Sequence, residues 1–256
     1  MREIEVRRCD PAGNITLFVL TPTEKKDYAA VARALLAMQS LGGEQVGFLC
    51  ADGRMEMAAG EFCGNATRAF GYLTALRSGL TGVQTLSLPV SGCDHPVRVT
   101  VDVEKGEASV EMPLPRFAEK RTVDSVEGTL VHLGGIAHFV VENMPPDVSF
   151  FAKAEPLLRE DPALEAYGVC FLQGERMTPL VKVPKTESLF FEGSCGTGSM
   201  ACAIARSMGR DGISSFTLLQ PAGTVAASVE RKNGAVTACS IGGTVRIEPP
   251  QRVMIL

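Results

Sequence analysis

The chain has 256 residues, of which 45% are hydrophobic and 21% charged, and its net charge is −4. This composition is typical of a globular protein with one large or two smaller hydrophobic cores. The slight acidity argues against a basic surface for nucleic acid or an anionic membrane, and no apolar run reaches the roughly 18–20 residues that cross a bilayer. Because the N-terminal residues lack the apolar stretch of a secretory signal, the sequence predicts a cytoplasmic protein.

The first elements in chain order are a strand, a helix and a second strand. The segment "GNITLFV" (13–19) predicts a strand. Residues 23–40 predict a helix, with Thr23 as its N-cap and apolar side chains at helical spacing. The apolar segment "VGFL" (46–49) predicts the next strand of this half.

A second helix is predicted to begin at Cys63. Its apolar residues form one stripe from Ala66 to Leu76, and we expect the helix to end near Gly79. The segment "PVRVTVDVEKGEASVEM" alternates between apolar and polar residues and predicts an antiparallel hairpin that turns at Lys105-Gly106.

The second half of the chain repeats this order imperfectly. "GGIAHFV" (134–140) matches the first strand, "VCFL" (169–172) matches the second, and Cys195-Gly196 matches Cys63-Gly64. The helix after Cys195 is apolar nearly all round, which is typical of an enclosed helix, and a hairpin is expected at Asn233-Gly234.

The repeat predicts two similar α+β domains. We expect residues 1–120 to form the domain with Cys63 and residues 121–256 to form the domain with Cys195. The sequence leaves open whether the last strand returns to the first domain.

The eight cysteines could form disulfides, bind a metal or react. A chain of this length without a secretory signal points to a reducing compartment, where structural disulfides are rare. No Cys-x-x-Cys pair occurs and no histidine has zinc-type spacing to the cysteines, so we expect no metal site. Apolar surroundings predict packed, unreactive thiols at four positions: Cys50, Cys170, Cys202 and Cys239.

Cys63 and Cys195 each stand directly before a glycine at a predicted helix start. A helix N-terminus presents unpaired N–H donors and a partial positive charge, so we expect it to lower the pKa of a thiol and to attract a carboxylate. If two such helix starts meet, one thiolate can remove a proton from one face of a carbon while the other thiol protonates the opposite face. The N–H donors would stabilise the carbanion as its charge spreads into the carboxylate. The pattern therefore predicts stereochemical inversion by two bases.

The chain resembles the diaminopimelate epimerase-like, cofactor-independent racemases over nearly its whole length. The resemblance lies in "PAGNIT", "GEQVGF", "FCGNATRA" and "CGTGSMA". It implies two pseudo-symmetric α+β domains, each a curved, mostly antiparallel sheet or barrel around a central helix. It also implies that Cys63 and Cys195 are the two catalytic bases and that the enzyme needs no cofactor and no metal.

Within this family, the chain resembles most the histidine racemases of opine-metallophore biosynthesis, the staphylopine type. The shared segments are "EQVGF", "VSGC", the short loop "EGSCGTG" and "QPAG". Diaminopimelate epimerases carry an Arg after the Glu that precedes the second cysteine, and here Gly193 follows Glu192 directly. The family's Gly-Asn-Pro-His and Asn-x-Gly-Phe segments become "GIAH" and "GVCF". The resemblance thus implies an amino-acid substrate, with L- or D-histidine as the best single candidate, and the sequence leaves another polar or basic amino acid open.

The resemblance also assigns substrate-binding residues. Glu44 and Glu192 are expected to meet the side chain or amino group of the substrate, since a carboxylate can pair with imidazole. The predicted binding residues are Asn14, Glu44, Gln45, Gly64, Asn65, Glu192, Gly196 and Thr197. Two other residues are interpreted as structural: His138 as a hydrogen-bonded core histidine and Arg68 as a surface or inter-domain ion pair.

Other functions stay open from the sequence. One is diaminopimelate epimerase itself, which the missing Arg disfavours. Another is a redox-sensing or amino-acid-binding protein, which would use a reversible disulfide between Cys63 and Cys195 as its switch. We expect no nucleic-acid or membrane partner, and the sequence leaves open whether the chain forms a homodimer.

Overall fold

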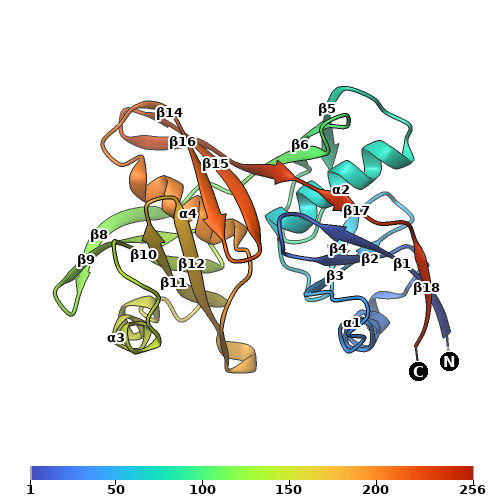
Figure 1. Cartoon of the computed structure of the whole chain (residues 1–256), viewed down its shortest axis with the longest axis horizontal. Helices are drawn as coiled ribbons and strands as arrows, with labels where there is room; N and C mark the ends of the chain where they lie inside the picture. Colours follow the sequence, from blue (N-terminus) through green and yellow to red (C-terminus); the bar gives the residue numbers. More distant parts are fainter. Residues whose placement is uncertain (1, 256) are drawn as a thin grey trace. The chain divides into compact units, whose positions relative to one another are not determined.

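The structure, a computed structural model, describes residues 2–255 apart from the side chain of residue 186. The protein is a mixed α+β structure with two β-sheets, and the described residues form four α-helices (Figure 1). The chain divides into two compact units, the first made of Met1–Glu111 with Gly242–Leu256 and the second of Met112–Ile241. The chain therefore passes from the first unit to the second and returns.

The first unit contains a sheet of six strands built around β1. β1 pairs antiparallel with β2, β17 and β18, so segments from both ends of the chain lie side by side. β2 is parallel to β3, which is antiparallel to β4, and α1 makes the crossover that a parallel pair requires. The bounds are β1 Arg2–Asp10, β2 Thr16–Val19, α1 Tyr28–Leu36, β3 Gln45–Leu49, β4 Met55–Met57, β17 Arg246–Ile247 and β18 Gln251–Ile255.

The helix predicted over 23–40 is shorter in the structure. A 3-10 turn, η1 (Lys25–Asp27), precedes α1. The prediction that Thr23 is the N-cap was wrong, because its hydroxyl donates to the Thr21 carbonyl at 2.9 Å, in the turn before the helix. The predicted apolar face is confirmed, since α1 buries Tyr28 and its apolar neighbours in one core cluster with β1, β2 and β3.

The helix predicted after Cys63 is α2 (Gly64–Arg77), which packs against the antiparallel strands β5 (Val83–Leu88), β6 (Val97–Asp102) and β7 (Glu107–Glu111). A Cβ at Gly71 would lie 2.4 Å from Val99 Cγ1, so the glycine allows the helix to approach β6 closely. The helix ends as predicted, with Gly79 at φ +64° just beyond it. Leu76 departs from the predicted buried stripe, because it is 39% exposed.

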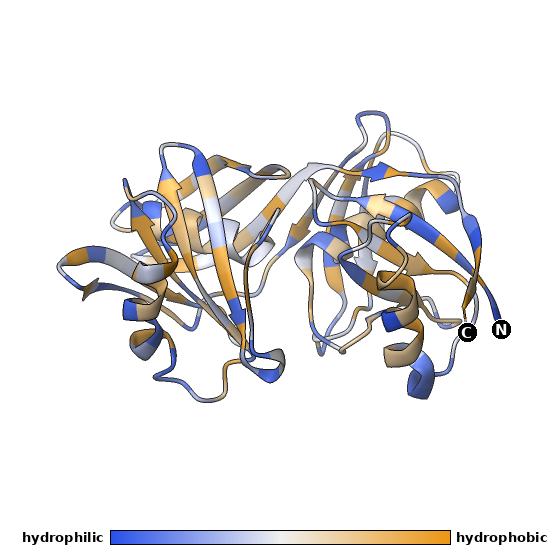
Figure 2. Ribbon diagram, turned by 60° about the horizontal axis from the view of Figure 1, so that its bottom comes forward, coloured by the Kyte–Doolittle hydropathy of each residue, from blue (hydrophilic) through white to orange (hydrophobic). Residues whose placement is uncertain are grey.

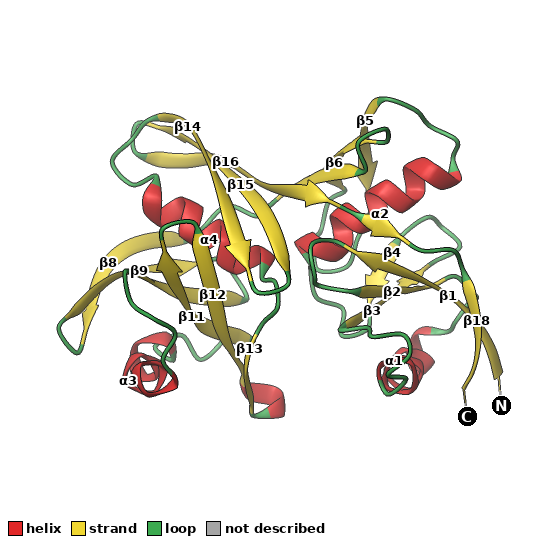
Figure 3. Ribbon diagram, viewed as in Figure 1, coloured by secondary structure: helices red, strands yellow, loops and turns green. Residues whose placement is uncertain are grey.

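In the second unit, four strands repeat the pairing of β1 to β4. β9 is antiparallel to β10, β10 is parallel to β11 with α3 as the crossover, and β11 is antiparallel to β12. β8 extends the sheet beyond β9, and β13 pairs with β12 (Figure 3). The bounds are β8 Phe117–Val123, β9 Val126–His132, β10 Ile136–Glu142, α3 Val148–Leu158, β11 Ala166–Gln173, β12 Arg176–Val183 and β13 Ser188–Phe191.

The second helix of this unit, α4 (Gly196–Arg206), is enclosed as its apolar composition predicts. Its residues Met200–Ile204 are all buried. It packs against β9, β10, β11, β14 (Gly212–Gln220) and β15 (Gly223–Lys232). The predicted hairpin between β15 and β16 (Ala235–Thr244) is confirmed, and its turn residues Asn233 and Gly234 have φ of 52° and 78°. Positive φ at both positions is the mark of a type I′ turn.

The hydropathy of the residues follows this packing of helices against sheets. Figure 2 shows hydrophobic residues along the inner strands of each unit and hydrophilic residues at many of the turns. No helix within residues 2–255 is long and apolar enough to cross a membrane.

Candidate active site

Cys63 is the N-cap residue of α2. Its backbone is extended, with φ −127° and ψ 111°, and its Sγ accepts the N–H of Ala66 at 3.4 Å. The Thr67 hydroxyl donates to the Cys63 carbonyl at 2.8 Å and fixes the first turn. The thiol is therefore held at the helix start by a free N–H of the first turn, which is the usual interaction of an N-cap side chain.

A chain of polar side chains connects Cys63 to the loop before β2. The Cys63 thiol donates to Gln45 Oε1 at 3.3 Å. Gln45 Nε2 donates to Asn14 Oδ1 at 2.7 Å and to Thr16 Oγ1 at 2.8 Å. Asn14 Nδ2 in turn donates to Glu44 Oε2 at 3.1 Å. Thr16 was not among the predicted site residues, although the parallel register places it directly beside Gln45.

Arg68 lies beneath this network and corrects a prediction. The side chain is 0% exposed, so the predicted surface position was wrong. Its Nε donates to Asn65 Oδ1 at 3.2 Å, and Nη2 donates to the Pro11 carbonyl at 2.8 Å. Nη1 donates to the carbonyls of Gly243 and Thr244 at 3.0 and 3.2 Å. Burial lowers the pKa of Arg68 to about 10, which still leaves it charged at neutral pH.

The "VSGC" segment holds the loop in front of Cys63. Ser91 Oγ donates to the Glu61 carbonyl at 2.7 Å and accepts the Met57 N–H at 2.9 Å. Gly92 has φ +71°, and a Cβ there would lie 2.2 Å from the backbone nitrogen of Phe62. Only glycine permits this approach, so the segment positions Cys63 through the loop that precedes it.

Cys195 is the N-cap residue of α4 in the second unit. Its Sγ accepts the N–H of Gly198 at 3.2 Å, and Ser199 Oγ donates to the Cys195 carbonyl at 2.7 Å. These two contacts have direct counterparts around Cys63. Gln220 also holds the Cys195 loop, since its Oε1 accepts the Cys195 N–H at 2.7 Å and its Nε2 donates to Ser199 Oγ at 2.9 Å. The sequence shows Gln220 only as part of the shared segment "QPAG" and does not predict these contacts.

A second polar chain leads from Cys195 into the core. The Thr197 hydroxyl lies 3.4 Å from Cys195 Sγ and 3.0 Å from His138 Nε2. His138 Nδ1 lies 3.6 Å from the Cys170 thiol. The prediction of a hydrogen-bonded core histidine is confirmed, since His138 is 0% exposed. The sequence did not predict that the histidine contacts the hydroxyl beside Cys195.

The predicted lowering of the thiol pKa values was wrong in its net direction. Burial raises the pKa of the Cys63 thiol and outweighs the hydrogen bonds with Ala66 and Gln45. Burial also raises the pKa of the Cys195 thiol well above its ordinary value. The Glu192 carboxylate raises it further by its charge and a hydrogen bond, whereas Thr197 and the Gly198 N–H lower it. Helix donors are present at both sulfurs, but withdrawal from water is the larger effect.

The two units hold the predicted site residues in two groups. Gly64 and Gly196 are the first residues of α2 and α4, and Asn65 is buried with its Nδ2 3.4 Å from Asn14 Oδ1. Burial raises the pKa of the Glu44 carboxyl despite the hydrogen bond from Asn14. The first unit thus gathers Asn14, Glu44, Gln45, Cys63, Gly64 and Asn65, and the second gathers Glu192, Cys195, Gly196 and Thr197.

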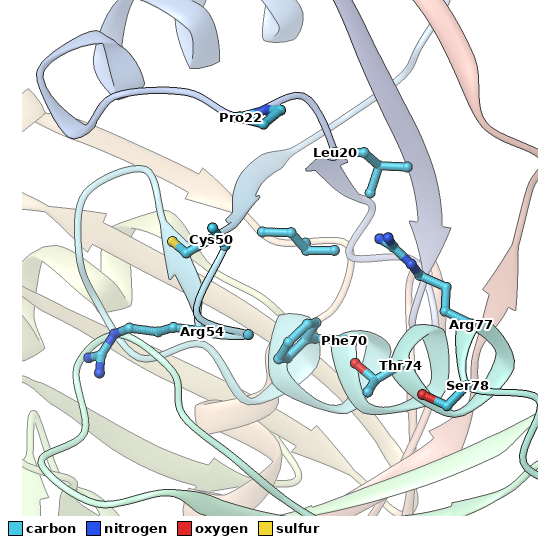
Figure 4. Close-up of a pocket in the computed structure, with 11 residues that line it drawn as sticks. Leu20, Pro22, Cys50, Arg54, Phe70, Thr74, Arg77 and Ser78 are labelled. Atoms are coloured by element: carbon cyan, nitrogen blue, oxygen red, sulfur yellow. The ribbon is translucent and has the colours of Figure 1, made fainter.

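A pocket of about 400 Å³ in the first unit contains none of these residues (Figure 4). One wall comes from Phe70, Thr74 and Arg77 of α2 and from Ser78 just beyond its end, and Leu20 is among the residues across from it. At 1.5 Å per residue, Thr74 lies about 16 Å along the helix from Cys63. The pocket is therefore separate from the polar network at the start of α2.

His138 predicts a pH dependence of stability. Burial lowers its pKa to about 4, from an ordinary value of 6.5. The unfolded chain therefore takes up a proton at higher pH than the folded chain, so the free energy of unfolding falls as pH drops from 6.5 towards 4. At 1.36 kcal/mol per pKa unit, the loss is about 3 kcal/mol. Urea unfolding between pH 7 and 4 measures it.

The variant His138→Gln is the control for this dependence, because glutamine can still reach Thr197 but does not titrate. We expect the stability of the variant to fall less over the same pH range. Parallel curves for the two proteins would show that another group carries the effect.

Comparison with solved structures defines the class of fold. A phenazine biosynthesis protein of the PhzF family from Bacillus anthracis has a TM-score of 0.69 and 15% sequence identity, covering 100% of both chains. A probable proline racemase from Agrobacterium radiobacter K84 has a TM-score of 0.64 and 15% identity, covering 98% of this chain and 93% of its own. The protein therefore has the α+β fold of the PhzF and proline racemase structures.

Comparison of sequences identifies the family. The family described as "Histidine racemase CntK N-terminal domain" matches residues 3–250, and the chain belongs to it. A relative from Staphylococcus aureus (strain Mu50), named histidine racemase, is 28% identical over 261 residues, which cover 94% of each chain. The protein is therefore an isomerase of the amino-acid racemase class.

Proposed function

We propose that the protein interconverts L- and D-histidine with Cys63 and Cys195 as its two acid–base groups. The observation that carries this proposal is the matched pair of N-cap thiols. Each sulfur accepts the backbone N–H of the residue three positions after the cysteine. Each cysteine carbonyl accepts the side-chain hydroxyl of the residue four positions after it. Two thiols in the same local setting suit two equivalent tasks on the two faces of one carbon.

The reaction moves two protons, one away from the α carbon and a different one back to its opposite face. One thiolate takes the α-proton of histidine and becomes a thiol, and the electron pair left on carbon spreads into the substrate carboxylate. The other thiol gives its proton to the opposite face of that carbon and becomes the thiolate. The enzyme ends with its two protonation states exchanged, so the reverse reaction starts from the same geometry. This scheme needs no cofactor.

The raised pKa values of the two thiols disfavour the thiolate that must act as the base, so the reaction needs a positive charge that favours this thiolate. A substrate ammonium group beside one thiol favours its thiolate, because an opposite charge lowers the pKa of an acid. Arg68 contributes a buried positive charge near Cys63.

The remaining predicted residues have assigned parts in this proposal. The backbone at Gly64-Asn65 and Gly196-Thr197 binds the carboxylate and stabilises the charge that develops there. Asn14 and Gln45 orient the amino-acid portion, and Glu44 and Glu192 meet the amino group or the imidazole. We further propose that the two units are the pseudo-symmetric domains of the diaminopimelate epimerase-like fold, each with a curved sheet around its central helix.

Incubation in deuterium oxide tests the proposal. L-Histidine should exchange its α-proton and lose optical rotation, whereas LL-diaminopimelate should not exchange. NMR of the α position and chiral chromatography measure both. Exchange of diaminopimelate without histidine would reject the substrate. No exchange in the reduced protein, together with a reversible Cys63–Cys195 disulfide, would instead support a cysteine switch.

A further inference from the structure

The strand directly before the Cys195 loop exposes three consecutive large apolar side chains. Leu189, Phe190 and Phe191 of β13 are 36%, 44% and 45% exposed. Among the described residues, β13 pairs only with β12, and four residues separate its end from α4 (Figure 3). Exposed apolar residues are common, but large ones this close to a candidate catalytic residue are candidates for contact with a ligand.

The strand register places the two phenylalanines on opposite faces of the sheet. Phe190 is opposite Val181 and Phe191 is opposite Leu180. Opposed residues of an antiparallel pair point to the same face. Leu180 belongs to the core cluster that includes α3, so Phe191 shares that face.

Phe190 shares the other face, on which α4 lies. Val181 Cγ2 and His138 Nδ1 come within 3.2 and 3.3 Å of the position that a Cβ on Gly168 would take. Val181 and His138 are therefore neighbours beneath α4, and the ring of Phe190 continues the same face towards the end of β13.

Glu192 connects this ring to the reactive sulfur. The Glu192 N–H donates to the Pro179 carbonyl at 3.0 Å, so the extended register continues one residue past β13. Residues two apart on an extended chain lie on one face at about 7 Å. The Glu192 carboxylate raises the pKa of the Cys195 thiol, so the two side chains lie close together. One face of the extended segment thus presents the ring of Phe190 and then the carboxylate of Glu192, which is next to Cys195.

We infer that Phe190 is a specificity-determining residue whose ring forms a wall for the imidazole side chain of the substrate. This inference rests on the proposed function. A flat apolar ring stacks on a planar imidazole and also attracts it when it is protonated. A flexible side chain with a charged end gains less, because that end would lose water without a partner on the ring.

The experiment compares Phe190→Ala with Phe191→Ala, a matched control of the same residue type and nearly the same exposure on the opposite face. Phe190→Tyr keeps the ring. Racemisation of L-histidine is followed by chiral chromatography, and circular dichroism with thermal unfolding shows that each variant is folded. We expect about a tenfold higher KM for Phe190→Ala with kcat within twofold of the parent. Phe191→Ala and Phe190→Tyr should stay within twofold in both constants.

Three outcomes would overturn the inference. The first is an unchanged KM in Phe190→Ala, and the second is a fall in kcat without a change in KM. The third is an equal effect of both alanine variants together with a lower mass in light scattering, which would make β13 part of a subunit interface. Failure of the proposed function is distinct, since the parent protein itself would then leave the α-proton of histidine in place.

Discussion

Replacement of Cys63 or Cys195 by serine should reduce histidine racemisation by about 1,000-fold or more. A serine hydroxyl fills nearly the same space and can accept the same backbone N–H, but it is far too weak an acid to supply an anionic base near neutral pH. General acid–base groups contribute about 100- to 10,000-fold to a rate, and inversion requires both of them. Chiral chromatography of the product measures the loss for each variant.

Two other cysteines provide the controls. Cys202 lies on α4 itself, two turns beyond Cys195, and its thiol contacts Met177 Sδ at 3.4 Å in the core. Cys50 is half-buried in the first unit, where its sulfur lies 3.4 Å from the Tyr28 hydroxyl. Serine at either position should leave kcat within about twofold and lower stability at most. Full turnover in Cys63→Ser or Cys195→Ser would remove the two-base mechanism.

Replacement of Arg68 by methionine should lower the free energy of unfolding by about 3 kcal/mol. The substitution keeps much of the buried volume, but it removes donors from three backbone carbonyls and from Asn65. Each buried polar group left without a partner costs about 1–3 kcal/mol. Urea unfolding at neutral pH measures the change. The KM for histidine should rise as well, because Arg68 fixes Asn65 beside Asn14.

The control is Arg77→Met on the exposed end of the same helix. We expect its stability to stay within about 0.5 kcal/mol of the parent, as for most surface substitutions. Arg68→Lys should restore only part of the lost stability, because an ammonium cannot present the donors of a planar guanidinium. Equal stability of Arg68→Met and the parent would contradict the buried network.

The order of the elements and the two helix-starting cysteines could be read from the sequence. Local rules determine these features: apolar periodicity, capping residues and the Asn233-Gly234 turn depend on neighbours only a few residues away. The predicted start of the first helix at Thr23 was wrong for a local reason, since the Thr23 hydroxyl donates to the preceding turn and the helix starts later. The fold class followed from the repeat and the resemblance, and the solved structures share that α+β fold.

In each of the two groups of predicted site residues, the sequence determined which residue types are present. The tertiary structure decided which of them form hydrogen bonds with one another and how deeply each is buried. Only the packed chain brings Gln45 to the Cys63 thiol, buries Arg68 beneath Asn65 and places His138 against Thr197. The same packing reverses the expected shift of the thiol pKa values. The physical reason is that withdrawal from water depends on all the segments that surround a group, whereas a helix cap depends on one short segment.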